Sequence, residues 1–139
     1  MPVLTRLYVK SSLVFFVAAL TAGLGLTAGR VSDLPPVLNA LGPVYFHLFM
    51  VGWVAQLIFG IVFWMFPKYS HEHPRGSERL AWAVFWLLNS GLALRVLVEP
   101  LHSLQPRPAT GWLLVISALL QWLAGMAFVA NTWARVKEK

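Results

Sequence analysis

The sequence has no cysteine and few charged residues of either sign. The absence of cysteine from its 139 residues excludes disulfides, thiolate metal sites, iron–sulfur clusters and covalent c-type haem attachment. Charged residues make up 12% of the chain, about half of the usual ~25%. A chain with so few charges has too little polar surface to cover a water-soluble globule. The composition therefore excludes a soluble enzyme, a disordered tail and an ordinary nucleic-acid-binding domain.

Long runs of apolar residues make up most of the sequence. Hydrophobic residues make up 58% of the chain, and about 20 largely apolar residues cross ~30 Å of hydrocarbon as a helix. Four stretches have that length and composition. We therefore predict an all-α membrane protein, a four-transmembrane-helix antiparallel bundle that lies in the lipid bilayer as a single domain over residues 1–139. The predicted spans cover residues 11–28, 44–66, 80–98 and 112–133.

Prolines mark the predicted helix ends, because proline cannot continue the backbone hydrogen-bond ladder. Pro43 and Pro67 bracket the second span, and we expect the third span to stop before Pro100. The stretches 30–43 and 99–110 are rich in proline and are expected to form extended outer loops.

The distribution of basic residues predicts the orientation. If all four stretches cross the membrane, eight of the eleven basic residues lie on the side of the two termini, whereas Arg30 and Arg107 lie outside the spans on the other side. Basic residues favour the cytoplasmic side, so we expect both termini in the cytoplasm and the protein in the cytoplasmic (inner) membrane. The first run resembles a secretory signal but is long for one, and we interpret it as an uncleaved span. The eight basic residues are Arg6, Lys10, Lys68, Arg75, Arg79, Arg135, Lys137 and Lys139.

His47 is predicted to lie about one turn inside the outer end of the second span. An ionisable group at that depth is costly and is a candidate for function by default. Imidazole is also a common ligand of haem iron. The alternative is a histidine that hydrogen-bonds to a neighbouring helix or is hydrated at the interface.

Arg95, Glu99 and His102 follow one another at spacings of four and three, which places them on one helical face near the outer end of the third span. Arg95 could bind an anionic group such as a haem propionate. His102 is predicted at a level similar to that of His47 and could be a second axial ligand or a propionate partner. The alternative is an Arg95–Glu99 pair that satisfies itself, with His102 in a solvated loop. The candidate cofactor-binding residues are His47, His102, Arg95 and Glu99, with His47 and His102 as the candidate metal ligands.

Other small and polar residues are better explained by helix packing. Gly52, Gln56 and Gly60 recur at steps of four, and small residues on one stripe let membrane helices approach closely. His71 and His73 flank a glutamate in the second connection, where we expect a solvated loop rather than a metal site. Four amide side chains are expected to hydrogen-bond between helices: Gln56, Asn89, Gln121 and Asn131.

The second span carries a recognisable motif, which runs from His47 to Trp53 as HLFMVGW and continues through Gly60 to Met65-Phe66-Pro67. It resembles a segment of the haem–copper oxidase catalytic-subunit-like membrane proteins, and is most similar to the C-family oxidase-like proteins and the NnrS-like haem proteins. Their pattern is roughly His-x-His-x(4)-Gly-Trp, then an apolar stretch with glycine, then an aromatic residue and proline. Where that pattern has its first histidine, this chain has Tyr45.

The resemblance implies a b-type haem near the outer leaflet, with His47 as an axial ligand. A complete oxidase site needs more histidines than the four in this chain, which excludes oxygen reduction by this chain alone. We therefore predict a small membrane protein that binds haem b and transfers electrons or binds a diatomic gas, as a homo-oligomer or with respiratory-chain proteins. The alternative is a haem-free accessory or scaffold subunit of a respiratory membrane complex. A small channel or metal carrier is a third, weaker interpretation.

Overall fold

The computed structural model describes residues 1–31, 35–69 and 75–136. Its regular structure in these ranges is helical, and four helical stretches are long and apolar enough to cross a membrane. They pack as a bundle, as the sequence predicts. The stretches are Val3–Val31 (α1), Pro36–Met65, Glu78–Leu104 (α4) and Pro108–Trp133 (α5). His71 and His73, expected in a solvated loop, lie outside the described residues.

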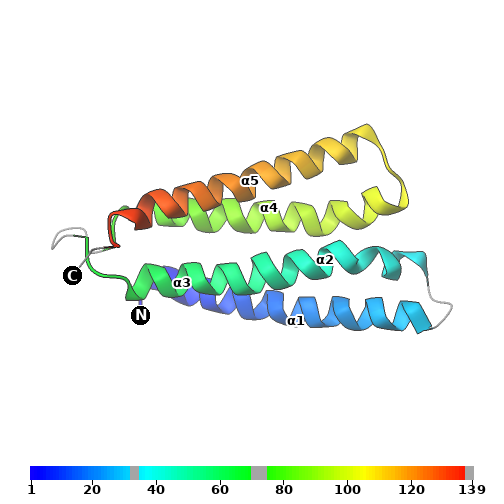
Figure 1. Ribbon diagram of the computed structural model, residues 1–139, viewed down its shortest axis with the longest axis horizontal. Helices are drawn as coiled ribbons and strands as arrows, with labels where there is room; N and C mark the ends of the chain where they lie inside the picture. The colour runs from blue at the N-terminus through cyan, green and yellow to red at the C-terminus, as the bar shows by residue number, and fades with distance from the viewer. Residues whose placement is uncertain (32–34, 70–74, 137–139) are drawn as a thin grey trace.

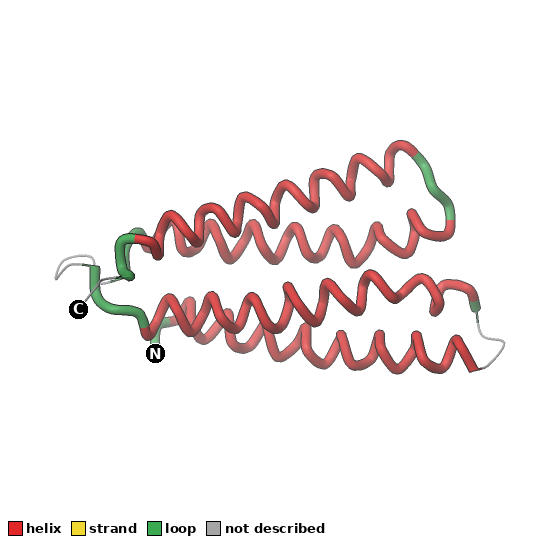
Figure 2. The backbone as a smooth tube through the Cα atoms, viewed as in Figure 1, coloured by secondary structure: helices red, strands yellow, loops and turns green. Residues whose placement is uncertain are grey.

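The helices lie side by side along one long axis, and consecutive helices run in opposite directions (Figure 1). Both chain termini lie at one end of the bundle, which we name the terminal end, and the opposite end is the distal end. The backbone forms two helical hairpins (Figure 2). One hairpin joins α1 to the Pro36–Met65 stretch, and the other joins α4 to α5.

The described helices extend beyond the predicted spans, and two expected loops are largely helical. The expectation that the third span stops before Pro100 is wrong, because α4 continues through this proline to Leu104. Proline removes one backbone donor but leaves the next turn intact: the Gln105 N–H donates to the Leu101 carbonyl at 2.9 Å. Only residues 105–107 separate α4 from α5.

The expected extended loop over residues 30–43 is also mostly helical where it is described. Arg30 belongs to the last turn of α1. The segment Pro36–Leu41 (η1) is a 3₁₀-helix, which starts where proline is preorganised for a helical turn. The Leu38 N–H donates to the Pro35 carbonyl at 3.0 Å and closes its first turn.

The Pro36–Met65 stretch changes its helical type three times, first where the 3₁₀-helix η1 ends. An α-helical turn, Gly42–His47 (α2), leads into an eight-residue π-helical segment, Leu48–Ala55 (η2), and then into the α-helix Gln56–Met65 (α3). The Gln56 N–H reaches back five residues to the Val51 carbonyl. Wider turns of this kind are rare and occur frequently at functional sites.

His47 lies next to the buried stripe of this stretch, one residue before the buried Leu48. Gly52, Gln56 and Gly60 recur at the predicted steps of four, whereas His47 precedes Gly52 by five residues. In an α-helix, five residues correspond to a rotation of about 500° around the axis. Two side chains five residues apart therefore point in directions about 140° apart. The buried residues Leu48 and Val44 continue the steps of four, and His47 beside them reaches Arg95 on α4.

Most of the buried core lies in the terminal half of the bundle. The Tyr8 ring meets the Phe85 ring edge-on at 5.0 Å, and the Phe59 and Phe128 rings stack at 3.8 Å. A smaller cluster of Ala19, Val44 and Leu48 packs at the distal half, alongside the candidate site described below. The larger cluster consists of Leu4, Tyr8, Phe63, Ala81, Val84, Phe85, Leu88 and Ala124.

Candidate functional site at the distal end

His47 is the last residue of α2, and its ring is held at both nitrogens. The Nδ1 atom lies 2.8 Å from the Pro43 carbonyl oxygen one turn earlier. The Nε2 atom lies 3.1 Å from Nη1 of Arg95 on α4. A guanidinium can only donate, so Nε2 is the acceptor and the proton of the neutral ring is on Nδ1. The His47 side chain is 21% exposed, which makes it half-buried.

Arg95 connects three elements of the bundle through its guanidinium. Besides the His47 contact, Nη1 donates to Oε1 of Glu99 one turn further along α4, at 3.3 Å. The Nε atom donates to the Ser117 hydroxyl at 3.2 Å, and Nη2 donates to the Leu114 carbonyl at 3.5 Å, both on α5. A cation at this depth must be paired or solvated. Arg95 meets that requirement inside the chain, and so ties α2, α4 and α5 together.

Glu99 completes the cluster and is more buried than its partners, with 10% of its side chain exposed. Its Oε1 atom faces Arg95 on one side and Nδ1 of His47 on the other, the latter at 3.2 Å. Its Oε2 atom is buried and has no hydrogen-bond partner among the described residues. The cluster therefore holds a guanidinium, a carboxylate and an imidazole, and one carboxylate oxygen has no partner among the described residues.

Ser117 supports the cluster from α5. Its hydroxyl donates to the Gly91 carbonyl at 2.7 Å and accepts from Arg95 and from Nε2 of Gln121. The close approach of α4 and α5 depends on Gly91, where an added Cβ would lie 3.0 Å from the Ser117 carbonyl oxygen. Sequence analysis did not identify Ser117 as part of the site. A serine four residues before Gln121, on the predicted packing face of the last span, was the available signal.

His102 lies apart from this cluster. It occupies the last turn of α4, and its Nδ1 atom is 2.6 Å from the Thr110 hydroxyl in the first turn of α5. The structure thus brings together His47, Arg95 and Glu99 and directs His102 to the α4–α5 connection. Within the described ranges no group of three or more histidine, aspartate or glutamate side chains is arranged to hold a metal ion.

A second polar cluster lies deeper in the bundle. Gln56 is fully buried, and its Nε2 atom donates to the Ser11 hydroxyl at 2.5 Å and to Oδ1 of Asn89 at 3.2 Å. The Asn89 amide in turn donates to the Phe85 carbonyl at 2.7 Å. These bonds join α1, α3 and α4, which confirms the predicted interhelical hydrogen bonding of Gln56 and Asn89.

The cluster could offer a haem iron one nitrogen, Nε2 of His47, whereas His102 lies outside the cluster. Histidines that bind metals usually donate their second ring N–H to a carbonyl or carboxylate. His47 has that arrangement, since Nδ1 faces the Pro43 carbonyl and Glu99 while Nε2 points into the bundle. Arg95 is a suitable partner for a haem carboxylate. It also faces the Nε2 lone pair, so coordination requires its Nη1 atom to move away.

No family model matches the chain, and no curated protein or solved structure matches it at a significant level. The geometry of the chain itself therefore carries the functional argument.

Proposed function

We propose that the chain is a small integral-membrane protein that binds a b-type haem through His47. One observation carries the proposal: His47 is anchored at Nδ1 by the Pro43 carbonyl, which leaves Nε2 directed into the bundle beside a guanidinium. Imidazoles that bind metals usually have their other ring nitrogen bonded to a carbonyl or carboxylate in this way. The π-helical segment that begins at the next residue gives independent support, because such segments recur at functional sites.

In this proposal the three clustered side chains have separate roles. His47 would hold the iron through Nε2, and Arg95 would pair with a haem carboxylate. Glu99 keeps the imidazole oriented through Nδ1. Haem would supply reversible one-electron chemistry or a binding position for a diatomic gas such as nitric oxide or oxygen. Because His102 bonds to Thr110, the described cluster favours a single axial histidine and hence gas binding or sensing.

Electron transfer through two axial histidines is the second form of this proposal. The second imidazole would be His102, after it leaves Thr110, or His47 of another copy in a homo-oligomer. Respiratory-chain proteins of the same membrane are the partners that electron transfer would require. The bias of basic residues supports an inner-membrane location with both termini, and hence the terminal end, in the cytoplasm.

A reduced-minus-oxidised visible spectrum of the detergent-purified protein, recorded with and without carbon monoxide, tests the proposal. We expect b-type bands that shift with the gas, and we expect His47→Ala to remove them. His102→Ala is the matched control and should leave the bands in place. Bands that ignore the gas and disappear in His102→Ala would instead support bis-histidine ligation and electron transfer. Full, unshifted bands in His47→Ala would refute the proposed ligand.

A haem-free accessory or scaffold subunit of a respiratory membrane complex is the second candidate function. It is favoured by the way the chain itself satisfies Arg95, through contacts to His47, Glu99 and Ser117. In that case the cluster serves to join the helices. This candidate predicts a colourless protein, even after haem is added, that co-purifies with larger membrane proteins.

A further inference from the structure

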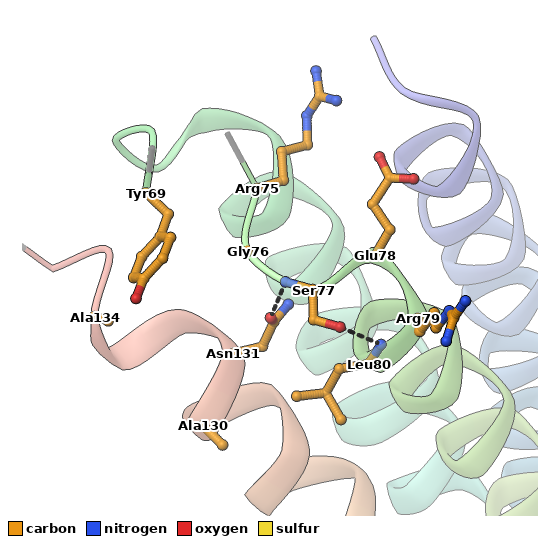
Figure 3. A pocket seen from close by; sticks show the side chains of 10 residues that line it. All are labelled: Tyr69, Arg75, Gly76, Ser77, Glu78, Arg79, Leu80, Ala130, Asn131 and Ala134. Carbon is orange, nitrogen blue, oxygen red and sulfur yellow. Dashed lines mark hydrogen bonds between the residues drawn. The ribbon is translucent and has the colours of Figure 1, made fainter. Parts of the chain in front are cut away.

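The terminal end of the bundle contains a cavity of about 970 Å³. Its walls come from the end of α5, the segment that leads into α4, and Tyr69 (Figure 3). Figure 3 shows Ser77 and Asn131 near the centre of the view, with the Arg75 side chain extending upward, away from them, and the Arg79 side chain on the right. The cavity lies at the opposite end of the bundle from the His47 cluster.

The two helices that form the cavity are fixed to each other. The Asn131 side-chain oxygen accepts from the Ser77 N–H at 2.9 Å, and the Ser77 hydroxyl caps α4 by accepting from the Leu80 N–H. Gly76 has a φ of 74°, in the left-handed region, and an added Cβ there would lie 2.7 Å from Oδ1 of Asn131. The backbone N–H groups of Ser77 and Leu80 thus already donate to partners within the fold. The positive charge of the cavity therefore comes from side chains.

Arg75 and Arg79 both line the cavity, and neither forms a hydrogen bond or ion pair with another described residue. Glu78 is the one acidic residue among the lining residues. Arg135 follows Ala134, which lines the cavity, and its side chain is buried at 1% exposure.

Arg135 is a buried cation that lines a smaller cavity, which shares Asn131 with this one. Its guanidinium donates to three carbonyls at the end of α3, those of Phe63, Phe66 and Pro67, and to no carboxylate among the described residues. Burial and the positive charge of Arg75 lower the pKa of Arg135. A bound anion would offset the repulsion between these two arginines.

The position of the cavity relative to the membrane indicates the kind of anion. Its lining includes Tyr69, beyond the end of α3, and residues 75–80, where α4 begins, and the last turn of α5 contributes to it. Tyr69 and Trp133 are exposed there, as aromatic residues are at the headgroup level of a bilayer. The anions concentrated at that level are lipid phosphates.

We propose that this cavity binds the phosphate of an anionic phospholipid headgroup, with Arg75 and Arg79 as its donors. Arginine recognises phosphate oxygens through charge-assisted hydrogen bonds. The site is independent of haem and of the function proposed above.

The test uses the full chain in nanodiscs or mixed micelles that contain phosphatidylglycerol or only phosphatidylcholine. Native mass spectrometry measures retained lipid, and a thermal melt measures stability. Phosphatidylglycerol is expected to be retained and to raise the melting midpoint. Arg75→Gln/Arg79→Gln should weaken its binding by about 25-fold, from about fivefold for each arginine.

The control variant is Arg6→Gln/Lys10→Gln, which removes the same charge from the same end of the bundle without touching the cavity. It should retain the lipid. Arg75→Lys/Arg79→Lys should fold and should keep part of the binding, which separates lost charge from lost structure. Equal loss in the control, or equal retention of both lipids by the wild type, would overturn the proposal. Equal stabilisation by inorganic phosphate would overturn the lipid as its source.

Discussion

The Nη1 atom of Arg95 lies 3.1 Å from Nε2 of His47, although the two residues are 48 positions apart and belong to different hairpins. Arg95 also bonds to Glu99 and Ser117. Its single guanidinium therefore connects α2, α4 and α5. The same contact determines how the site can work, because the imidazole lone pair that a metal would need is the one that Arg95 faces.

Removing Arg95 alone should destabilise the bundle more than removing it with its carboxylate partner. Arg95→Met leaves the Glu99 carboxylate buried without its cation, at a cost of about 3–5 kcal/mol. Arg95→Met/Glu99→Met removes both charges and should cost less than Arg95→Met alone, because a buried pair is often replaceable by apolar residues. Denaturant unfolding in micelles, followed by circular dichroism, measures the free energies of unfolding. If the double variant lost as much free energy of unfolding as the two single variants lose in sum, Arg95 and Glu99 would not be coupled.

Deleting one residue from the π-helical segment should separate His47 from Arg95. Removal of Met50, an exposed residue of η2, shortens the step from His47 to Gly52 to four. The preceding turn then rotates by about 100° relative to the Gly52–Gly60 stripe. The deletion should retain helical content but lose the haem bands, if they are present in the wild type, and much of the stability that Arg95 provides. Met50→Leu is the control and should keep both, whereas an unaffected deletion variant would show that the wide turns do not position His47.

The four spans could be predicted from the sequence because a span requires only a continuous segment of sufficient length and apolar composition. About 20 apolar residues are needed to cross the hydrocarbon, and the four runs stand out in any window of that length. Helix ends were less predictable. Pro100 stops neither α4 nor its hydrogen bonding, since the Gln105 N–H still reaches the Leu101 carbonyl. Proline is a probable boundary rather than a necessary one.

The candidate site was predictable in part, for a physical reason. The Arg95–Glu99 pair follows from a spacing of four on one helix, and the structure confirms it at 3.3 Å. The contact of this pair with His47 joins two hairpins, and the spacing of residues along one helix does not include such a contact. Ser117 and the Thr110 partner of His102 come from α5, and such contacts depend on how two helices pack.

Replacing Gly60 by alanine and replacing Gly125 by alanine should have different effects on the free energy of unfolding. An added Cβ at Gly60 would lie 2.6 Å from the Tyr8 Cβ, whereas nothing lies within 4 Å of one at Gly125. Gly60→Ala should therefore destabilise the packing of α1 on α3 by about 1–3 kcal/mol. Gly125→Ala should be neutral, or stabilising by up to about 1 kcal/mol through helix propensity. Unfolding of both variants in the same detergent gives the comparison, and equal responses would contradict the close approach at Gly60.

Arg135 should be required for the stability of the terminal end. Its guanidinium donates to the carbonyls of Phe63, Phe66 and Pro67, which have no helical partner because α3 ends at Met65. A cation there also complements the negative end of the α3 dipole. Arg135→Met keeps most of the apolar contact and removes these bonds, so it should lower the free energy of unfolding by about 3 kcal/mol.

The matched control for Arg135 is Arg107→Met, at the other end of α5, where the guanidinium is exposed and bonds to the Gln105 side chain. That substitution should change stability by less than about 0.5 kcal/mol. Hydrogen exchange of the α3 and α5 ends localises the effect, because loss of the Arg135 bonds should increase exchange at the terminal end and leave the distal cluster protected. Equal losses in the two variants, or increased exchange along the whole bundle, would mean that Arg135 acts through general charge rather than by holding the end of α3 against α5.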